Sequence, residues 1–375
     1  NIPKMNHQIS IVGSQLLPIY VGIKEFNPDK VHFIVSNESI GSIAVLKPLL
    51  KNIQHSVHNC NAFDFFAIKA TCEKIIDKIE SSDSITFNLT GGTKIMVLAC
   101  QALIIEKGLN GFYVNQDDTL LELPSYTRKK INTELDTKEF LDLSGHNISS
   151  SNVLSDFTAD DFKMSAVIES FANSDRRYTV ITNHFRKKYN NSNQKISSAG
   201  KENLPNGIEV VWSINSVLIK ANGKDLLSLK SKNILQLFFN SAWWELQVAK
   251  EMSNWSKLKE LLINSVLPFK IDIKSAKNEI DVLLNTGKKL IFVECKSGNV
   301  KQEDVNKMKA IKQTYGGLIS KSILVSRFLP SPTIIEKCKE LDIDIFYCYA
   351  FQNRMVNPLN KVLVKLDEIN KKGSM

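Results

Sequence analysis

The fold of the first half is decided by the stretch Ser84-Ile-Thr-Phe-Asn-Leu-Thr-Gly-Gly-Thr-Lys94, which runs into an apolar segment from Ile95 to Glu106. Apolar residues over 84–89 predict a strand, and those over 95–106 predict a helix. The glycines between them predict a tight turn. A strand that passes through a short turn into a helix is one part of a βαβ unit, so this stretch predicts a parallel sheet.

The same alternation of strand and helix extends to both sides of this stretch. We expect strands at 8–12, 31–35 and 111–114 and a helix at 65–79. Small polar residues follow the strand ends at Gly13-Ser-Gln15, Ser36-Asn-Glu38 and Thr90-Gly-Gly-Thr-Lys94. Ligands of such sheets bind beyond the carboxyl ends of the strands, so the first half predicts a ligand site there.

The turn from Thr90 to Lys94 has the chemistry of a phosphate site. Its glycines let the backbone approach an anion, and the following helix offers free N–H groups. The Walker A and dinucleotide glycine patterns are both absent from this segment. A purely structural turn with a threonine that caps the helix would have the same kind of sequence. The segment alone therefore leaves both a phosphate site and a structural turn open.

Length and composition indicate a globular protein of two domains. The chain has 375 residues, of which 43% are hydrophobic and 23% charged, and domains average about 150 residues. No apolar run reaches the ~18–20 residues that cross a bilayer, so we expect no membrane partner and a cytoplasmic location. The six cysteines include no CxxC pair, which is typical of thiols in a reducing compartment.

The net charge of +9 is unevenly distributed along the chain. Residues 1–150 carry 14 Lys and Arg against 16 Asp and Glu, whereas residues 151–375 carry 34 against 23. The net charge is therefore −2 for the first half and +11 for the second half, so we expect the second half to bind a polyanion. Lysines that merely solvate helices would give the same excess.

The second half also alternates strands and helices after a polar linker at 144–156. We expect helices at 158–190, 235–252, 300–314 and 333–341, a loop at 190–206, a hairpin strand at 208–219 with its turn at Asn222-Gly223, and strands at 261–269, 279–284, 290–296, 322–325 and 343–347. This order gives a first domain at 1–145, a linker with an intervening helical and hairpin region at 146–235, and a last domain at 236–375.

The hairpin predicted over 278–296 carries the chemical signal of the last domain. Its turn at 285–289 makes two antiparallel strands, on which Asp281 and Glu294 converge. In strict alternation, Ile280, Val282 and Leu284 face away from Asp281. Adjacent carboxylates repel unless a cation lies between them, and hard oxygen ligands suit Mg²⁺ or Mn²⁺. Lys296 remains close enough to orient a water or stabilise a phosphorane.

This D-x(12)-E-x-K pattern resembles the PD-(D/E)xK nuclease superfamily. The resemblance implies a restriction-endonuclease-like α/β domain in which Asp281, Glu294 and Lys296 are catalytic and Asp281 and Glu294 bind the metal. The helix-borne Glu245 is a further candidate ligand, by the same resemblance. Surface ion pairs on a solvated strand are the alternative. We expect Glu279 to be a solvated carboxylate. Trp243 and Trp244, which are neighbours in the sequence, are expected to be core residues more than residues that stack on bases.

The segment Asn88-Leu-Thr-Gly-Gly-Thr-Lys-Ile-Met96 resembles the signature of CARF domains, the Rossmann-like sensors of cyclic oligoadenylates in type III CRISPR defence. The first two strand ends resemble their other ligand loops. A CARF domain followed by a PD-(D/E)xK domain implies a homodimeric nuclease activated by cyclic tetra-adenylate. By this resemblance the ligand contacts are Ser14, Gln15, Ser36, Asn88, Thr90, Gly91, Gly92, Thr93 and Lys94.

Three matters stay open from the sequence. The substrate is DNA, single-stranded or nicked as a duplex, and/or RNA. A non-catalytic regulator is one alternative function, with a helix-turn-helix inside 158–190. A ring nuclease, in which Thr93 and Lys94 assist cleavage of the activator itself, is the other.

Overall fold

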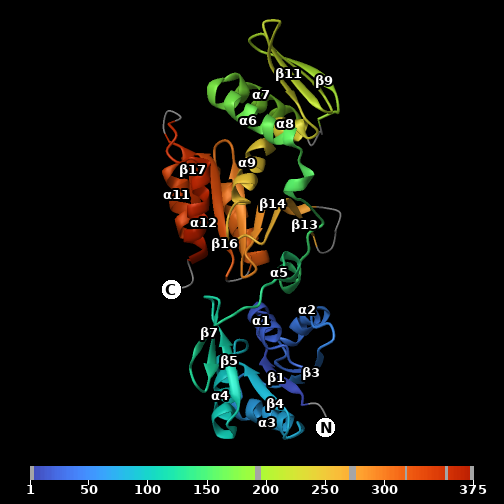
Figure 1. The fold of residues 1–375 in the computed structure, drawn as a ribbon, viewed down its shortest axis with the longest axis vertical. Helices are drawn as coiled ribbons and strands as arrows, with labels where there is room; N and C mark the ends of the chain where they lie inside the picture. The colour runs from blue at the N-terminus through green and yellow to red at the C-terminus, as the bar shows by residue number, and fades with distance from the viewer. Residues whose placement is uncertain (1–3, 191–195, 270–275, 317–318, 351–353, 372–375) are drawn as a thin grey trace.

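The computed structural model describes residues 4–190, 196–269, 276–316, 319–350 and 354–371. The molecule is elongated, with a seven-stranded sheet at one end, a six-stranded sheet in the middle and a four-stranded sheet at the other end (Figure 1). The expected α/β fold with two different sheet domains is confirmed.

The first sheet has the strand order β3-β2-β1-β4-β5-β6-β7. Its first five strands are parallel and its last two are antiparallel. The strands are β1 (Asn6–Ile11), β2 (Lys30–Val35), β3 (Gln54–Asn59), β4 (Ser84–Asn88), β5 (Asn110–Val114), β6 (Thr119–Leu123) and β7 (Arg128–Lys130). The helices are α1 (Leu17–Phe26), α2 (Ile43–Leu46), α3 (Phe65–Ile76) and α4 (Lys94–Lys107). The four predicted strands of this half are present as β1, β2, β4 and β5, and β3, β6 and β7 are additional.

Helices cover both faces of the first sheet. On one face, Ile19 and Ile23 of α1 pack against Val31 and Phe33 of β2 in one apolar cluster. On the other face, α3 and α4 pack against β1 and β4 in a second cluster. Because both faces are covered, the carboxyl ends of the strands are where the sheet meets a ligand.

The central sheet has the order β17-β16-β15-β14-β13-β8, with parallel pairing from β15 to β17. Helices α9 and α12 pack on one face and α10 and α11 on the other. The strands are β8 (Ser150–Asn152), β13 (Glu260–Pro268), β14 (Ala276–Asn285), β15 (Leu290–Lys296), β16 (Lys321–Phe328) and β17 (Asp344–Tyr349). The helices are α9 (Ala242–Met252), α10 (Gln302–Ile311), η5 (Lys312–Gly316), α11 (Pro332–Glu340) and α12 (Val362–Lys371).

The region expected as linker, loop and hairpin is more structured than its composition suggests. Residues 150–152 form β8, which pairs with β13. The segment 208–219 does not form one strand but spans two, because the chain already turns between Ser213 and Ser216. Asn222-Gly223, with φ of 49° and 76°, then joins β11 to β12 as expected for a turn of this composition. Of the expected loop at 190–206, residues 191–195 lie outside the described residues.

This intervening region forms a small module of three helices and an antiparallel sheet, ordered β12-β11-β10-β9. Its elements are α6 (Ala159–Ser174), α7 (Arg177–Phe185), α8 (Ile234–Phe239), β9 (Gly200–Leu204), β10 (Ile208–Ser213), β11 (Ser216–Ala221) and β12 (Lys224–Lys230). The module shares one apolar cluster with the central sheet. Trp243 and Trp244 are 0% and 1% exposed in that cluster, so they are core residues and not a stacking platform.

The short helix α5 (Thr137–Leu143) bridges the first sheet and the central sheet (Figure 1). Its Phe140 and Leu141 belong to one apolar cluster with Ile19 of α1 and with Phe292 and Tyr315 of the central domain. Glu260 of β13 accepts hydrogen bonds from the Thr137 N–H and hydroxyl. The two sheet domains are therefore joined by a continuous apolar contact.

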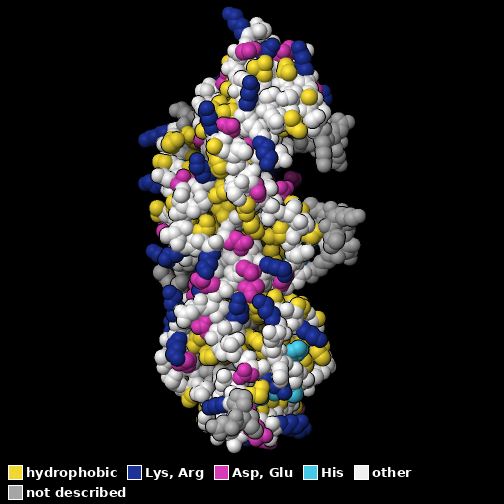
Figure 2. All heavy atoms as spheres, turned by 45° about the vertical axis from the view of Figure 1, so that its right-hand side comes forward, with side chains coloured by type: hydrophobic (Ala, Val, Ile, Leu, Met, Phe, Trp, Pro, Cys, Tyr) yellow, Lys and Arg dark blue, Asp and Glu magenta, His cyan; other side chains and the backbone are white. Residues whose placement is uncertain are grey.

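Two further expectations concern the whole chain. No helix among the described residues is long and apolar enough to cross a membrane. All six cysteines are free thiols, and only Cys60 is not fully buried. On the face drawn in Figure 2, Lys and Arg side chains are spread over both halves and do not gather in one patch.

Candidate active site and ligand pocket

The predicted catalytic residues lie on the hairpin of β14 and β15. Val282 pairs with Val293, so the preceding Asp281 and the following Glu294 meet where the two strands separate. Gly287, with φ of 81°, closes the turn at the other end of the hairpin. The local fold therefore brings together two carboxylates that are 13 positions apart in the sequence.

Strict alternation of faces does not hold at Asp281. Ile280 packs in the cluster that contains Leu283, whereas Val282 and Leu284 pack in the opposite cluster, so the expectation that all three share a face is wrong. Opposite this point, Asn264 of β13 has φ of 51°. The change of face at Asp281 therefore coincides with an irregular residue on the neighbouring strand.

The carboxylates of Asp281 and Glu294 are each held by donors of the protein. The Cys295 N–H donates to Asp281 Oδ2 at 2.6 Å. The Glu294 side chain is buried, with Lys296 Nζ 2.8 Å from Oε1 and Lys307 Nζ 3.1 Å from Oε2. Lys296 Nζ also lies 3.1 Å from Asp304 Oδ1. Asp281, Glu294 and Lys296 thus converge in one site.

Burial and the crowding of acidic groups shift the pKa values of several side chains in this site. Burial, and next the charge of Glu294, raise the pKa of Asp281 to about 7. Burial and then the charges of Asp281, Glu279 and Glu294 raise the pKa of Glu245. Burial alone would lower the pKa of Lys296, but the Glu294 carboxylate outweighs it and raises that pKa. Negative charge therefore accumulates here beyond what the lysines neutralise.

A divalent cation fits the chemistry of these donors. Two hard carboxylate ligands that lie close enough to repel each other gain most from a metal ion between them. No group of three or more His, Cys, Asp and Glu side chains within the described ranges is arranged to hold a metal. Asp281 and Glu294 are therefore considered as a pair, and Glu245 of α9 lies near enough for their charges to raise its pKa.

Lys307 and Asp304 of α10 were not expected from the sequence. They are three residues apart and so lie on the same side of the helix, where Lys307 reaches Glu294 and Asp304 reaches Lys296. The sequence signal was only that a helix follows E-x-K. Which side of that helix faces the site is set by Val305 and Met308, which pack in the core.

The ligand turn of the first domain depends on close backbone contact. A Cβ placed on Gly91 would lie 2.1 Å from the carbonyl oxygen of Ile11, and one on Gly13 would lie 2.8 Å from the Gly92 nitrogen. The end of β1 and the turn after β4 therefore touch through their main chains. This contact leaves no room for side chains at those positions.

Asparagine and threonine side chains shape this turn from inside. Asn88 is fully buried, and its Oδ1 accepts from the Thr90 N–H and hydroxyl at 3.0 and 2.7 Å. The Thr90 hydroxyl oxygen also accepts from the Val114 N–H at 2.8 Å. Thr93 caps α4 by accepting from the Met96 N–H and donates to the Ala62 carbonyl. The hydroxyls of Thr90 and Thr93 are thus already hydrogen-bonded within the protein.

The other candidate ligand residues differ in exposure. Ser14, Gln15, Gly92 and Lys94 are exposed, whereas Ser36 is buried and its N–H donates to Ser39 Oγ at 2.9 Å. The structure brings Ser14, Gln15 and Thr90 together on one cavity. The other predicted ligand residues do not line that cavity, namely Ser36, Asn88, Gly91, Gly92, Thr93 and Lys94.

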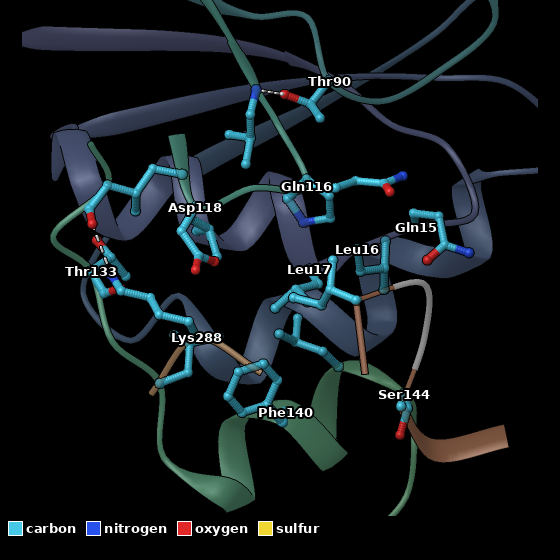
Figure 3. A pocket seen from close by; sticks show the side chains of 18 of the residues that line it. Gln15, Leu16, Leu17, Thr90, Gln116, Asp118, Thr133, Phe140, Ser144 and Lys288 are labelled. Carbon is cyan, nitrogen blue, oxygen red and sulfur yellow. Dashed lines mark hydrogen bonds between the residues drawn. The ribbon is translucent and has the colours of Figure 1, made fainter. Parts of the chain in front are cut away.

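The cavity has a volume of about 360 Å³ and lies between the two sheet domains. Gln15 and Gln116 lie on one side of it, Leu16 and Leu17 in its middle, and Lys288 at the other side (Figure 3). Asn115 and Gln116, which follow β5, also line it and were missed by the sequence analysis. They follow the end of the fourth predicted strand, at 111–114, and that strand end is the signal that would have indicated them.

A parallel sheet with a ligand turn, joined to a sheet domain with a D…E-x-K site, defines a sensor domain coupled to a nuclease-type domain. Family models identify both parts: residues 8–140 match the Card1 CARF domain, and residues 233–348 match the Card1-like endonuclease domain. The chain therefore combines a CARF domain of the Card1 type with a Card1-like endonuclease domain. No curated protein matches the chain.

Solved structures share this fold at low sequence identity. Protein VC1899 from Vibrio cholerae is 14% identical, with a TM-score of 0.74 over 98% of this chain and 99% of its own. Can2 from Sulfobacillus thermosulfidooxidans, in complex with cyclic tetra-adenylate, is 16% identical, with a TM-score of 0.72 over 97% and 99%. A type III CRISPR defence DNA nuclease activated by cyclic oligoadenylate is 14% identical, with a TM-score of 0.58 over 98% of this chain and 52% of its own.

Proposed function

We propose that the chain is a metal-dependent endonuclease of type III CRISPR antiviral defence, activated by cyclic tetra-adenylate. The observation that carries this proposal is the convergence of Asp281, Glu294 and Lys296 inside a domain of endonuclease type. The CARF domain supports a cyclic oligoadenylate as the activator, and the likeness to Can2, solved with cyclic tetra-adenylate, supports four adenylates.

In this proposal each residue of the hairpin has its own role. Asp281 and Glu294 hold Mg²⁺ or Mn²⁺, which would supply Lewis-acid activation of water against a phosphodiester. Lys296, 2.8 Å from Glu294, orients the water and stabilises charge on the phosphorane. Glu245, whose pKa is raised by burial and by the neighbouring carboxylates, is the candidate for a further ligand.

The sensor site is proposed at the carboxyl ends of the first sheet. Main-chain N–H groups at Gly91, Gly92 and the start of α4 bind phosphate, and Lys94 adds a charge. Ser14 and Gln15 contact the ligand directly, whereas Ser36, Asn88, Thr90 and Thr93 hold the loops in shape. Two copies of the chain form a homodimer that encloses one ring.

The domain limits proposed are 1–145 for the sensor, 146–235 for the intervening region and 236–375 for the nuclease, in a protein of the cytoplasm. The substrate is DNA, as single strands or as nicked duplex, and/or RNA. The endonuclease match favours catalysis over a purely regulatory role. Ring cleavage at Thr93 and Lys94 remains a prediction that the same assay can test.

The experiment is a cleavage assay on plasmid, single-stranded DNA and RNA, with Mn²⁺ or Mg²⁺ and with or without cyclic tetra-adenylate. Glu294→Ala and Lys296→Ala should abolish cutting and keep ligand binding. Glu336→Ala and Lys339→Ala, exposed on α11, are the matched controls. Cutting by a Glu294→Ala/Lys296→Ala double variant would refute the catalytic assignment, and linear adenylate products would reveal ring cleavage.

A further inference from the structure

The cavity between the domains has walls from both of them. The first domain contributes Gln15, Leu17 and Gln116, and the bridging helix contributes Phe140. The nuclease domain contributes the turn of the catalytic hairpin at 287–288 and the helical segment 313–316. An occupant of this cavity would therefore touch the sensor and the nuclease at the same time.

The lining has the chemistry of a purine site. The volume of about 360 Å³ lies at the lower end of the roughly 300–1,000 Å³ range of small-molecule pockets. Side-chain amides suited to the ring nitrogens and amino group of adenine come from Gln15, Asn115, Gln116 and Gln313. Tyr113, Phe140 and aliphatic side chains supply apolar walls for the base faces.

The phosphate turn adjoins this cavity, because Thr90 at the start of the turn and Ser14 after β1 both line it. A nucleotide whose phosphate lies on the turn can therefore extend its base toward the junction. Figure 3 shows Thr90 and Gln15 on the sensor side and Lys288 and Phe140 on the opposite side.

The hairpin turn that lines the cavity belongs to the same two strands that carry Asp281 and Glu294. Lys288 Nζ donates to the carbonyl oxygens of Ile131 and Thr133, and the Gly287 carbonyl accepts from the Leu135 N–H at 2.8 Å. The same turn joins β14, which carries Asp281, to β15, which carries Glu294. Displacement of the turn by an occupant would move the strands that hold both carboxylates.

We propose that the interdomain cavity receives one adenine base of the activator, so that the bound cyclic adenylate contacts Gln313 and Lys288 of the nuclease domain directly. This inference rests on the proposed activation by cyclic tetra-adenylate. It adds that the nuclease domain is part of the ligand site. The bound ligand would contact the turn of the catalytic hairpin, and this contact would transmit binding to the two carboxylates.

The test is isothermal titration of cyclic tetra-adenylate into the full-length wild type and into three single variants. Gln313→Ala removes the amide on the nuclease wall, and Gln116→Ala removes one on the sensor wall. Gln236→Ala, exposed on α8 of the distal module, is the matched control. All three side chains are exposed, so the variants should fold, which thermal unfolding verifies.

We expect Gln313→Ala and Gln116→Ala each to weaken binding by about 5–10-fold, the size of a lost hydrogen bond, and Gln236→Ala to bind like the wild type. Wild-type affinity in Gln313→Ala while Gln116→Ala is weakened would overturn the inference, because the base would then contact the sensor alone. Absence of binding by the wild type would instead refute the proposed activator itself.

Discussion

At the end of the first sheet the ligand turn presents mainly main-chain N–H groups and neutral side chains. At the hairpin of the central sheet, by contrast, two lysines contact the Glu294 carboxylate, and the Cys295 N–H holds the Asp281 carboxylate. Both sites are proposed to face phosphate. The turn depends on how closely two backbones approach, so added atoms should disturb it. The hairpin depends on a balance of buried charges, so changes of charge should disturb it.

The largest effect should come from neutralising a carboxylate of the hairpin. Glu294→Gln keeps the shape but removes a buried charge that Lys296 and Lys307 both contact. We expect the cleavage rate to fall by about 10²–10³-fold, as for other electrostatic groups that act in a transition state. Single-turnover cleavage at saturating metal and activator measures it.

In the same variant, binding of cyclic tetra-adenylate should be unchanged, because no contact joins Glu294 to the ligand turn among the described residues. The exposed Glu336→Gln of α11 is the control. A parallel loss of ligand affinity in Glu294→Gln would break the distinction between the two sites.

The turn should respond most strongly to added bulk. In Gly91→Ala the new Cβ would meet the Ile11 carbonyl oxygen at 2.1 Å, so β1 and the turn must separate. We expect a loss of stability of about 1–3 kcal/mol, typical of overpacking, with at least a tenfold loss in activator affinity. Thermal unfolding and calorimetric titration measure the two effects.

The matched control for the turn is Gly41→Ala, where an added Cβ meets nothing within 4 Å. It should bind the activator and unfold like the wild type. Normal binding by Gly91→Ala would show that the ligand is not held by this turn.

The distinction between the sites also explains what the sequence could predict. Strands with regular apolar periodicity, the glycine turn and the E-x-K spacing are local signals and were predicted. Strand β3 was missed because its sequence, Gln54-His-Ser-Val-His-Asn59, is polar, and tertiary pairing with β2 determines it. Lys307 was missed because its approach to Glu294 depends on how α10 packs on the sheet. Long-range packing leaves no mark at a fixed spacing in the chain.

A smaller effect is expected at Lys307, which holds Glu294 Oε2 at 3.1 Å. Its positive charge competes with a metal for the same carboxylate. Lys307→Met should therefore lower the Mn²⁺ concentration for half-maximal cleavage, by about fivefold if the contact is worth about 1 kcal/mol. The measurement is cleavage rate against Mn²⁺ at fixed activator.

Lys309→Met, exposed on the same helix, should leave the metal dependence unchanged. An increased Mn²⁺ requirement in Lys307→Met would mean that Lys307 supports metal binding and does not oppose it. The charge balance of the hairpin would then need to be reassigned.

The smallest effect concerns the helix that joins the two sites. Asp136 caps α5 by accepting from the Glu139 N–H at 2.7 Å, and the Glu139 side chain accepts from the Asp136 N–H. Asp136→Ala should lower the free energy of unfolding by about 1 kcal/mol and loosen α5, which packs between the domains.

Asp64→Ala is the control, because it removes a comparable cap from α3 of the sensor, at Ala67, with a similar cost in stability. If α5 transmits the signal, only Asp136→Ala should raise the activator concentration for half-maximal cleavage above that for half-maximal binding. Equal behaviour of the two variants would mean that α5 stabilises the junction without transmitting the signal, and the hairpin turn at Lys288 would remain as the route between the sites.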